Sequence, residues 1–285
     1  VDCCDLENMT KAMEGCDIVY HTAATAYEGL SVFSPVLVTR NIFEASVTTI
    51  TAAIRNKVKR IVYCSSMARY GHHDQVPYKE DYECRPQDPY GIAKKAGEDV
   101  LRNLCETHGV EYVIAVPHNI VGPRQKYDDP FRNVMSIMLN RMLQGKQPII
   151  YGDGKQQRCF SYIDDCLYCL NALAFQDNVV GEIINIGPDE EPITINELAE
   201  ACANETGINL DPIHHKDRPK EVKLAVCSSD KARELLGYST ATNLRQSVKK
   251  TAEYIRSRGT KKFQYHLPLE IINDKTPETW KNKLI

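Results

Sequence analysis

Tyr90 and Lys94 stand four residues apart in a stretch, Tyr90-Gly-Ile-Ala-Lys94, that we expect to be helical. Side chains at positions i and i+4 of a helix share one face, with Cβ atoms about 5–6 Å apart. At an effective dielectric near 20 and a separation of about 6 Å, a lysine cation attracts a phenolate by roughly 3 kcal/mol, or about two pKa units. A tyrosine brought close to neutral pH in this way can take a proton from an alcohol while hydride leaves the same carbon.

A serine pair follows the buried apolar run that we expect to be a strand over residues 60–66. The hydroxyls of Ser65 and Ser66 therefore emerge at the carboxyl end of a parallel strand, where α/β folds build their sites. A serine in this position also often serves as a helix or turn cap. A tyrosine four residues before a lysine occurs by chance on many helices, so the trio of Ser66, Tyr90 and Lys94 is predicted from both motifs together.

The elements that must position this trio alternate along the first two thirds of the chain. Short apolar runs alternate with longer amphipathic stretches, which is typical of β-α-β units and a parallel sheet. We expect strands over 17–24, 60–66 and 112–116, and helices over 41–56 and 90–107, the second opened by Pro89. The later elements are smaller and mixed: helices over 131–145, 195–207, 229–237 and 244–258, and a strand over 147–151.

Composition narrows the class of protein. The 285 residues carry a net charge of -3 and scattered Lys and Arg, which argues against nucleic acid as a partner. No apolar run approaches the roughly 20 residues that span a bilayer, and the start has no export signal, so we expect no membrane partner. Eleven cysteines without framework spacing indicate reduced thiols and a cytoplasmic location. Cys166 and Cys169 have helical apolar spacing, which favours small core residues, and we predict no metal site.

Further motifs accompany the trio in a fixed order. Ser65-Ser66-x-x-x-Tyr70-Gly71 precedes Tyr90-x-x-x-Lys94, a strand ending His21-Thr-Ala-Ala24 comes before both, and Asn119-x-x-Gly-Pro follows. Tyr151-Gly-Asp-Gly154, Arg158-Cys-Phe-Ser-Tyr-Ile-Asp-Asp165 and Arg218-Pro-Lys-Glu221 come later. This series runs through nearly the whole chain and resembles the extended short-chain dehydrogenase/reductases of the NAD-dependent epimerase/dehydratase family. It is most similar to the members that epimerise UDP-sugars at C4.

The resemblance implies an α/β fold: a Rossmann-like, doubly wound parallel sheet with a smaller C-terminal mixed α/β substrate domain. Residues 1–125 would belong to the NAD-binding domain, with 155–190 returning to it, residues 126–265 mainly to the substrate domain, and 266–285 to a tail. The sequence has no glycine-rich strand-to-helix turn for a pyrophosphate. We therefore expect an N-terminally truncated sheet, with roughly 55–60 residues preceding Val1. A binding or regulatory protein without redox chemistry is the alternative.

The resemblance also implies roles for individual residues. Asp5 and Leu6 match the pair that holds the adenine of NAD, and the wall along its ribose and phosphates matches Ala23, Ala24 and Asn41. Tyr90 and Lys94 match the nicotinamide-ribose contacts, with Ser66 bonded to the reacting oxygen. The substrate contacts that the resemblance implies are Asn119, Tyr151, Arg158 and Arg218. The two arginines would grip the diphosphate bidentately, although each could instead form an ordinary surface ion pair.

The residues after Ser66 bear on the reaction. Similar enzymes that dehydrate or decarboxylate a sugar carry an acidic residue between the serine and the Tyr-Gly pair, where this chain has Met67, Ala68 and Arg69. The chain therefore has no carboxylate in this segment that could carry out a second proton transfer. This favours a UDP-sugar 4-epimerase over a dehydratase or decarboxylase. Ala225 matches a position that gates the sugar's 2-substituent, and its small side chain predicts acceptance of N-acetyl sugars.

Some positions depart from the family pattern, and they leave details open. Glu44 stands where many relatives have a glycine, and Pro117-His118 replace an Arg-aromatic pair. His118 could be a packing residue or a substrate contact. In relatives, the helices that match 41–56 and 90–107 pair across a two-fold axis, so we expect a homodimer.

Overall fold

A four-stranded parallel sheet forms the centre of the computed structural model, which describes residues 1–73, 75–219 and 222–285. Its strands lie in the order β1 (Ile18–His21), β2 (Arg60–Cys64), β3 (Glu111–Pro117) and β8 (Ile183–Ile186). The central strands β2 and β3 are almost wholly buried apolar runs, as expected for a sheet covered on both faces. Within the described residues, β1 has a paired strand on one side only.

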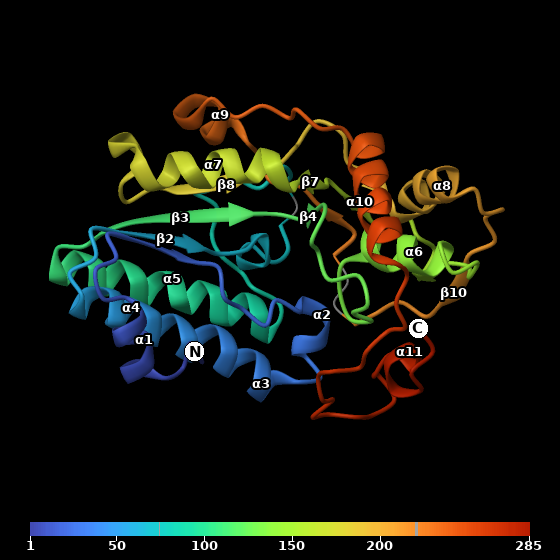
Figure 1. Cartoon of the computed structure of the whole chain (residues 1–285), viewed down its shortest axis with the longest axis horizontal. Helices are drawn as coiled ribbons and strands as arrows, with labels where there is room; N and C mark the ends of the chain where they lie inside the picture. The colour runs from blue at the N-terminus through green and yellow to red at the C-terminus, as the bar shows by residue number, and fades with distance from the viewer. Residues whose placement is uncertain (74, 220–221) are drawn as a thin grey trace.

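Helices cover both faces of this sheet, which confirms the predicted α/β class (Figure 1). One layer contains α1 (Leu6–Ala12), α3 (Pro35–Thr39), the π-helical turn η1 (Arg40–Glu44), α4 (Ala45–Arg55) and α5 (Pro89–His108). The other layer contains α7 (Ile163–Phe175) and α9 (Asp230–Leu236). The helix predicted over 41–56 begins earlier than expected, because Pro35 opens a helical run that continues through η1 into α4.

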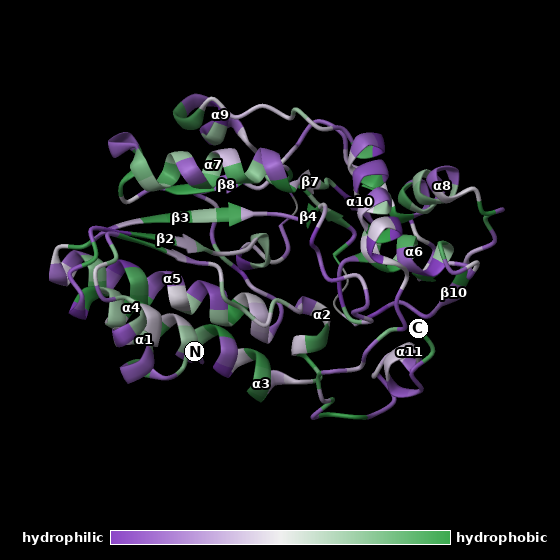
Figure 2. Cartoon of the chain, in the orientation of Figure 1, coloured by the Kyte–Doolittle hydropathy of each residue, from purple (hydrophilic) through white to green (hydrophobic). Residues whose placement is uncertain are grey.

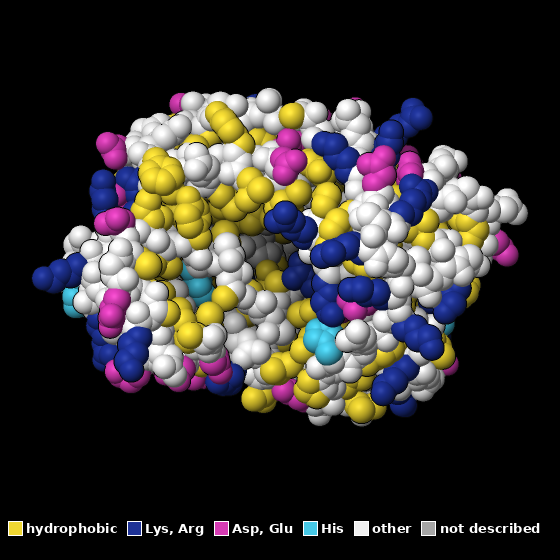
Figure 3. Space-filling view, viewed as in Figure 1, with side chains coloured by type: hydrophobic (Ala, Val, Ile, Leu, Met, Phe, Trp, Pro, Cys, Tyr) yellow, Lys and Arg dark blue, Asp and Glu magenta, His cyan; other side chains and the backbone are white. Residues whose placement is uncertain are grey.

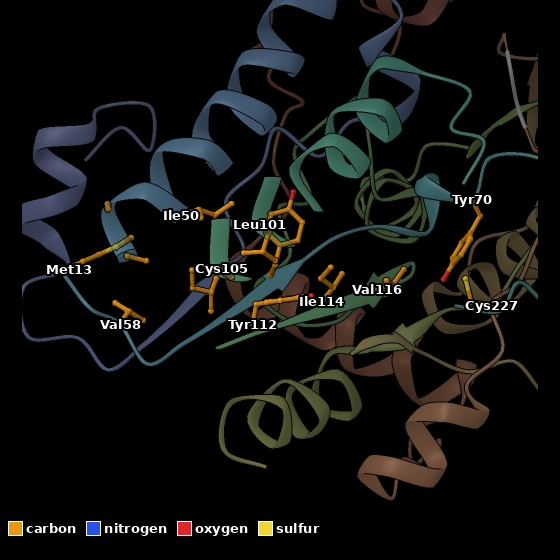
Figure 4. Packing of buried hydrophobic residues seen from close by; sticks show 14 of the residues in the cluster. Met13, Ile50, Val58, Tyr70, Leu101, Cys105, Tyr112, Ile114, Val116 and Cys227 are labelled. Atoms are coloured by element: carbon orange, nitrogen blue, oxygen red, sulfur yellow. The ribbon is translucent and has the colours of Figure 1, made fainter. Parts of the chain in front are cut away.

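Buried apolar side chains fix the layer of α4 and α5 onto the sheet. Ile50 from α4, Leu101 from α5 and Ile114 from β3 are fully buried in one cluster. Figure 4 shows this cluster extending from Met13 and Val58 at one end to Tyr70 and Cys227 at the other. The hydropathy colouring agrees, with apolar strands between helices whose outer faces are polar (Figure 2).

A second apolar cluster organises the later part of the chain. The helices α6 (Val134–Met142), α8 (Ile195–Thr206) and α10 (Leu244–Arg258) pack around it. Three small sheets accompany them: β5 (Ile149–Tyr151) with β10 (Ile213–His215), β6 (Gln157–Arg158) with β9 (Ile193–Thr194) and β11 (Leu224–Ala225), and β4 (Ile120–Val121) with β7 (Ser161–Tyr162). The remaining short elements are α2 (Glu28–Ser31), η2 (Met67–Arg69), η3 (Asp177–Val179) and α11 (Glu278–Lys281).

Cys166 and Cys169 lie in the core, as the sequence predicts. All eleven cysteines are free, and Cys166 and Cys169 are fully buried on α7. Burial raises the pKa of both thiols to about 12, which suits small core residues rather than redox centres. In the described part of the chain, no three His, Cys, Asp or Glu side chains converge on a possible metal position, and none of its helices has the length and apolar character to cross a bilayer.

Candidate active site

The carboxyl end of β2 brings the serine and the tyrosine of the predicted trio together. Ser66 follows β2 and caps the short turn η2, where its Oγ accepts the backbone N–H of Ala68 at 3.2 Å. Tyr90 lies at the start of α5, whose first turn is capped by the carboxylate of Asp88. A hydrogen bond between Ser66 and the Tyr90 hydroxyl joins the two. Ser66 is thus both a cap and a partner of the tyrosine.

Lys94 lies one turn further along α5 and is only 2% exposed. Its Nζ donates to the carbonyl of Cys64 at 2.7 Å and lies 5.4 Å from the centre of the Tyr63 ring. Burial lowers the pKa of Lys94 to about 8, against the opposing influence of Cys64 and Glu98. The amine is therefore held in place, with further N–H donors beyond the one bonded to Cys64.

The expectation that Tyr90 titrates close to neutral pH is wrong for this structure. Burial raises the pKa of Tyr90 to about 12, and the hydrogen bond with Ser66 offsets only part of this effect. The cation that most lowers the pKa of Tyr90 is Arg132, because Lys94 directs its ammonium toward the end of β2. The expectation from helical spacing considered only the attraction between Tyr90 and Lys94. It did not include the cost of burying the phenolate away from water.

A buried ion pair lies beneath the trio. The fully buried carboxylate of Glu98 bonds Arg69 Nε at 2.9 Å and accepts the hydroxyl of Ser65. Arg69 belongs to the η2 turn, so this pair ties the turn after β2 to α5. Glu98 is fully engaged and shielded from solvent, and it is unsuited to exchange protons with a substrate.

We call the four-stranded sheet and the helices that cover it the first lobe, and α6, α8 and α10 with the three small sheets the second lobe. The residues predicted along NAD lie in the first lobe. Ala23 and Ala24 follow β1, and Ala24 packs against the apolar cluster that contains Tyr90. Asn41 lies in η1 and donates from Nδ2 to Thr25 Oγ1 at 2.9 Å. Ala24 therefore lies close to Tyr90, and the contacts of Ala23, Ala24 and Asn41 with NAD stay predictions.

The predicted adenine pair occupies a different position. Asp5 caps α1, where its carboxylate accepts the backbone N–H of Asn8 at 3.1 Å and the Asn8 side-chain amide at 2.7 Å. Leu6 packs against the core cluster below the sheet. Neighbouring Cys4 lies against the carbonyl of Arg40, beside Asn41, so the two groups of predicted cofactor residues adjoin. The adenine contact itself stays a prediction.

On the substrate side, Asn119 and His118 follow β3. Asn119 adopts a left-handed backbone with φ 44° and donates from Nδ2 to the carbonyl of Cys159 at 2.9 Å. The imidazole of His118 is 1% exposed, and its Nε2 lies 3.0 Å from the carbonyl of Pro188. Burial lowers the pKa of this imidazole. The structure therefore favours packing over substrate contact for His118, a choice that the sequence leaves open.

The two predicted diphosphate arginines belong to the second lobe. Arg158 on β6 lies directly opposite Ala225 on the parallel strand β11. The guanidinium of Arg218 lies over the ring of Tyr151, with its carbon 5.0 Å from the ring centre. Lys220 and Glu221, the last residues of the Arg218 motif, lie outside the described residues.

A hollow opens between the two lobes on the face drawn in Figure 3. Lys and Arg side chains gather on its second-lobe side, near α6 and α10, whereas apolar side chains gather over the sheet. A cationic rim suits an anionic substrate such as a diphosphate.

Sequence reasoning missed two residues near the trio. Arg132 lies in the loop before α6 with its guanidinium 5.5 Å from the Tyr27 ring centre, and its charge acts on both Tyr90 and Lys94. No local motif marks this arginine, since the fold alone brings it to the trio. Glu98 could have been found, because it stands four residues after Lys94 on the buried face of the same predicted helix.

Comparison with known proteins identifies the family. Residues 1–187 match the model of the NAD dependent epimerase/dehydratase family. The chain belongs to this family. It is 31% identical to a putative UDP-glucose 4-epimerase of Methanocaldococcus jannaschii, over 85% of this chain and 77% of that protein. The cofactor is accordingly NAD, and the chain is a nucleotide-sugar enzyme of the epimerase/dehydratase type.

Solved structures of epimerases share the fold. A UDP-glucose 4-epimerase of Thermotoga maritima, with UDP-glucose, superposes with a TM-score of 0.85 at 28% identity, covering 90% of this chain and 84% of that one. A UDP-N-acetylglucosamine 4-epimerase of Methanobrevibacter ruminantium gives 0.84 at 27% identity, covering 91% and 82%. A dTDP-glucose 4,6-dehydratase of Streptomyces niveus is also similar, at 27% identity over 90% of this chain and 74% of that protein.

Proposed function

We propose that the chain is an NAD-dependent 4-epimerase of UDP-sugars, acting on UDP-glucose and UDP-galactose or on their N-acetyl forms. The observation that carries this proposal is the turn after Ser66. Its residues Met67, Ala68 and Arg69 offer no carboxylate, and Arg69 points inward to bind Glu98. Ser66, Tyr90 and Lys94 remain to act on the substrate, and reversible oxidation of one carbon needs no further acid or base.

In this reaction, Tyr90 takes the proton of the C4 hydroxyl and later returns it. Ser66 already bonds the Tyr90 hydroxyl, and it would hydrogen-bond the same substrate oxygen during the reaction. The positive charge of Arg132 favours the phenolate form. NAD, when bound, supplies the acceptor and donor of the C4 hydride, so that a 4-keto sugar can be reduced from either face. Lys94, with its remaining N–H donors, would hold the nicotinamide ribose.

The second lobe would anchor the nucleotide. Arg158 and Arg218 bind the diphosphate, a task that suits planar guanidinium groups because they pair bidentately with phosphate oxygens. Asn119 and Tyr151 complete the substrate contacts. Ala225 leaves room for an N-acetyl group at C2 of the sugar, and the similarity to a solved UDP-N-acetylglucosamine 4-epimerase supports this assignment.

One observation favours a second candidate function, a dehydratase. The carboxylate of Glu28 lies close enough to raise the pKa of Tyr90, and Glu28 is exposed. An acidic group in this place could serve the additional proton transfer that dehydration requires.

The product formed distinguishes the two functions. The chain is incubated with NAD and UDP-glucose or UDP-N-acetylglucosamine, and the sugars are separated by anion-exchange chromatography and identified by NMR. A C4 epimer without net NADH is the expected product. A 4-keto-6-deoxy sugar or carbon dioxide would overturn the epimerase assignment, and a chain that binds UDP-sugars without turnover would be a binding protein.

We further infer a homodimer in the cytoplasm. The exposed apolar side chains of Ile92 on α5 and Val36 on α3 support a partner surface on this helical layer. The absence of disulfides among the eleven cysteines supports a reducing compartment. Light scattering after size-exclusion chromatography tests the dimer, and a monomeric mass at micromolar concentration would exclude it.

A further inference from the structure

The last part of the chain, residues 265–285, crosses from the second lobe to the first (Figure 1). We call it the C-terminal strap. The backbone N–H groups of Glu270 and Ile271 donate to the carbonyl of Phe33 at 2.8 and 2.9 Å. The Glu270 carboxylate accepts the backbone N–H groups of Val36 and Leu37, at 2.9 Å each, and so satisfies the first turn of α3. These bonds fix the middle of the strap to the first lobe.

The strap then turns back and buries Thr279 and Trp280 of α11. Trp280 on α11 is 2% exposed and packs edge-to-face against Phe33 of the first lobe and Phe131 of the loop before α6. Tyr265, at the start of the strap, donates to the carbonyl of Thr279 at 3.1 Å. The strap therefore closes on itself and holds α11 in one position.

Two residues of α11 reach the predicted diphosphate site. The hydroxyl of Thr279 forms a hydrogen bond with the hydroxyl of Tyr151, whose ring carries the guanidinium of Arg218. On its other side, Arg218 approaches Gly29 of α2. A Cβ placed on Gly29 would lie 3.5 Å from both Arg218 Nη1 and the ring of Trp280. The strap thus contacts both the tyrosine beneath the arginine and the glycine beside it.

We propose that Thr279 and Trp280 are positioning residues of the nucleotide-sugar site, which set Tyr151 and Arg218 for a diphosphate. This inference rests on the proposed function. Thr279 fixes the tilt of the Tyr151 ring through its hydroxyl. Trp280 and Gly29 border the guanidinium from the other side. Arg218 is then pre-ordered, and ligand binding costs less side-chain entropy than it would with a mobile arginine.

The test is a double-mutant cycle on UDP affinity, measured by isothermal titration calorimetry with the whole chain. Thr279→Val and Tyr151→Phe each break the same hydrogen bond. We expect Thr279→Val to weaken UDP binding about fivefold, and the double variant to bind UDP no more weakly than Tyr151→Phe alone. Thr279→Ser keeps the hydroxyl and restores wild-type affinity. Thr276→Val is the matched control, because Thr276 is a buried threonine of the same strap that bonds only within it.

A steady-state assay separates positioning from general loss of structure. We expect KM for the UDP-sugar to rise in Thr279→Val while kcat and the affinity for NAD stay at their wild-type values. Thermal unfolding is followed in parallel for Thr279→Val and Thr276→Val. Unchanged UDP affinity in Thr279→Val, losses that add in the double variant, or an equal loss in Thr276→Val would overturn the inference alone. A wild-type chain that binds none of UDP, dTDP and GDP would overturn the proposed function as well.

Discussion

Tyr90 and Lys94 share the buried face of α5, yet their polar atoms reach different partners. The Tyr90 hydroxyl bonds Ser66, whereas Lys94 Nζ bonds the carbonyl of Cys64 at 2.7 Å. Both partners lie at the end of β2, so one strand end holds the proton-transfer group and the amine side by side. The spacing of the pair predicts their proximity, and the strand end determines which way each one points.

Replacement of the proposed base tests its role directly. We expect Tyr90→Phe to lower kcat about 10²- to 10⁴-fold, the usual contribution of a positioned acid/base. UDP affinity should not change, since the phenol is assigned to the sugar carbon and not to the diphosphate. Tyr168→Phe, on the exposed face of α7, is the matched control. A Tyr90→Phe enzyme that retains wild-type kcat would remove Tyr90 from the mechanism.

The buried amine of Lys94 predicts a pH dependence of stability. Its pKa is about 8 in the folded chain, whereas the ordinary pKa of a lysine is 10.5, so the unfolded chain binds the proton more tightly between these limits. The folded state therefore gains stability as pH rises from 8 toward 10.5. Relative to Lys94→Met, the wild type should gain about 2 kcal/mol of unfolding free energy between about pH 7 and 9.5.

Urea unfolding at the two pH values measures this difference. Cys64→Ser is added to both proteins, because Lys94 lowers the pKa of the Cys64 thiol. The other buried thiols and the tyrosines then contribute alike to both and cancel in the comparison. A gap between wild type and Lys94→Met that does not change with pH would show that the pKa of Lys94 in the folded chain stays at its ordinary value of 10.5.

The arginines assigned to the diphosphate should not tolerate lysine. We expect Arg158→Lys and Arg218→Lys each to weaken UDP binding about 10- to 100-fold, the value of a charge-assisted hydrogen bond. Arg85→Lys is the control, because Arg85 forms an exposed ion pair with Glu83. Calorimetry with UDP gives the three affinities. Equal affinity in all three variants would show that Arg158 and Arg218 do not bind the diphosphate and form ordinary surface ion pairs instead.

The size of residue 225 should control which sugar is accepted. Ala225→Tyr should reduce kcat/KM for UDP-N-acetylglucosamine at least about tenfold relative to UDP-glucose, because the ring occupies the space of the acetyl group. Ala225→Ser, which stays small, serves as the control. Competition between the two sugars in one reaction measures the ratio directly. An unchanged ratio would show that another residue forms the gate.

Replacement of Glu28 tests whether the enzyme is an epimerase or a dehydratase. Its charge raises the pKa of Tyr90, so Glu28→Gln should favour the phenolate and leave C4 epimerisation undiminished at neutral pH. If Glu28 were an acid/base in the reaction, its loss would cost about 10²-fold or more in kcat. NMR of the product mixture detects either outcome.

Local pattern was enough for most of the first lobe. The helix predicted over 90–107 is α5 at Pro89–His108, because Pro89, the Asp88 cap and the terminal Gly109 are all local signals. The early start of the helix before Asn41 was missed, although Pro35 marks it. The prediction of a near-neutral pKa for Tyr90 was wrong. Desolvation depends on how deeply the fold buries a residue, and the spacing of two residues on one helix does not show this burial.

Long-range contacts were beyond reach of the sequence. Arg132 and Thr279 are separated from Tyr90 and Tyr151 by loops and whole elements, and each polar group meets its partner only after both lobes have packed. Arg158 and Ala225 likewise face each other only because β6 and β11 pair. For these residues the sequence shows which chemistry the side chain can perform, but it does not show which residue the side chain contacts.

The pairing of Arg158 with Ala225 has a consequence for engineering substrate range. The anchor for the phosphate and the gate for the sugar share one two-residue ladder, Gln157–Arg158 against Leu224–Ala225. A bulky residue at 225 that displaces β11 would carry the guanidinium with it, so specificity and affinity would change together. Libraries that vary 225 should therefore vary the outer neighbours of both strands at the same time, so that a new gate can be selected without losing the anchor.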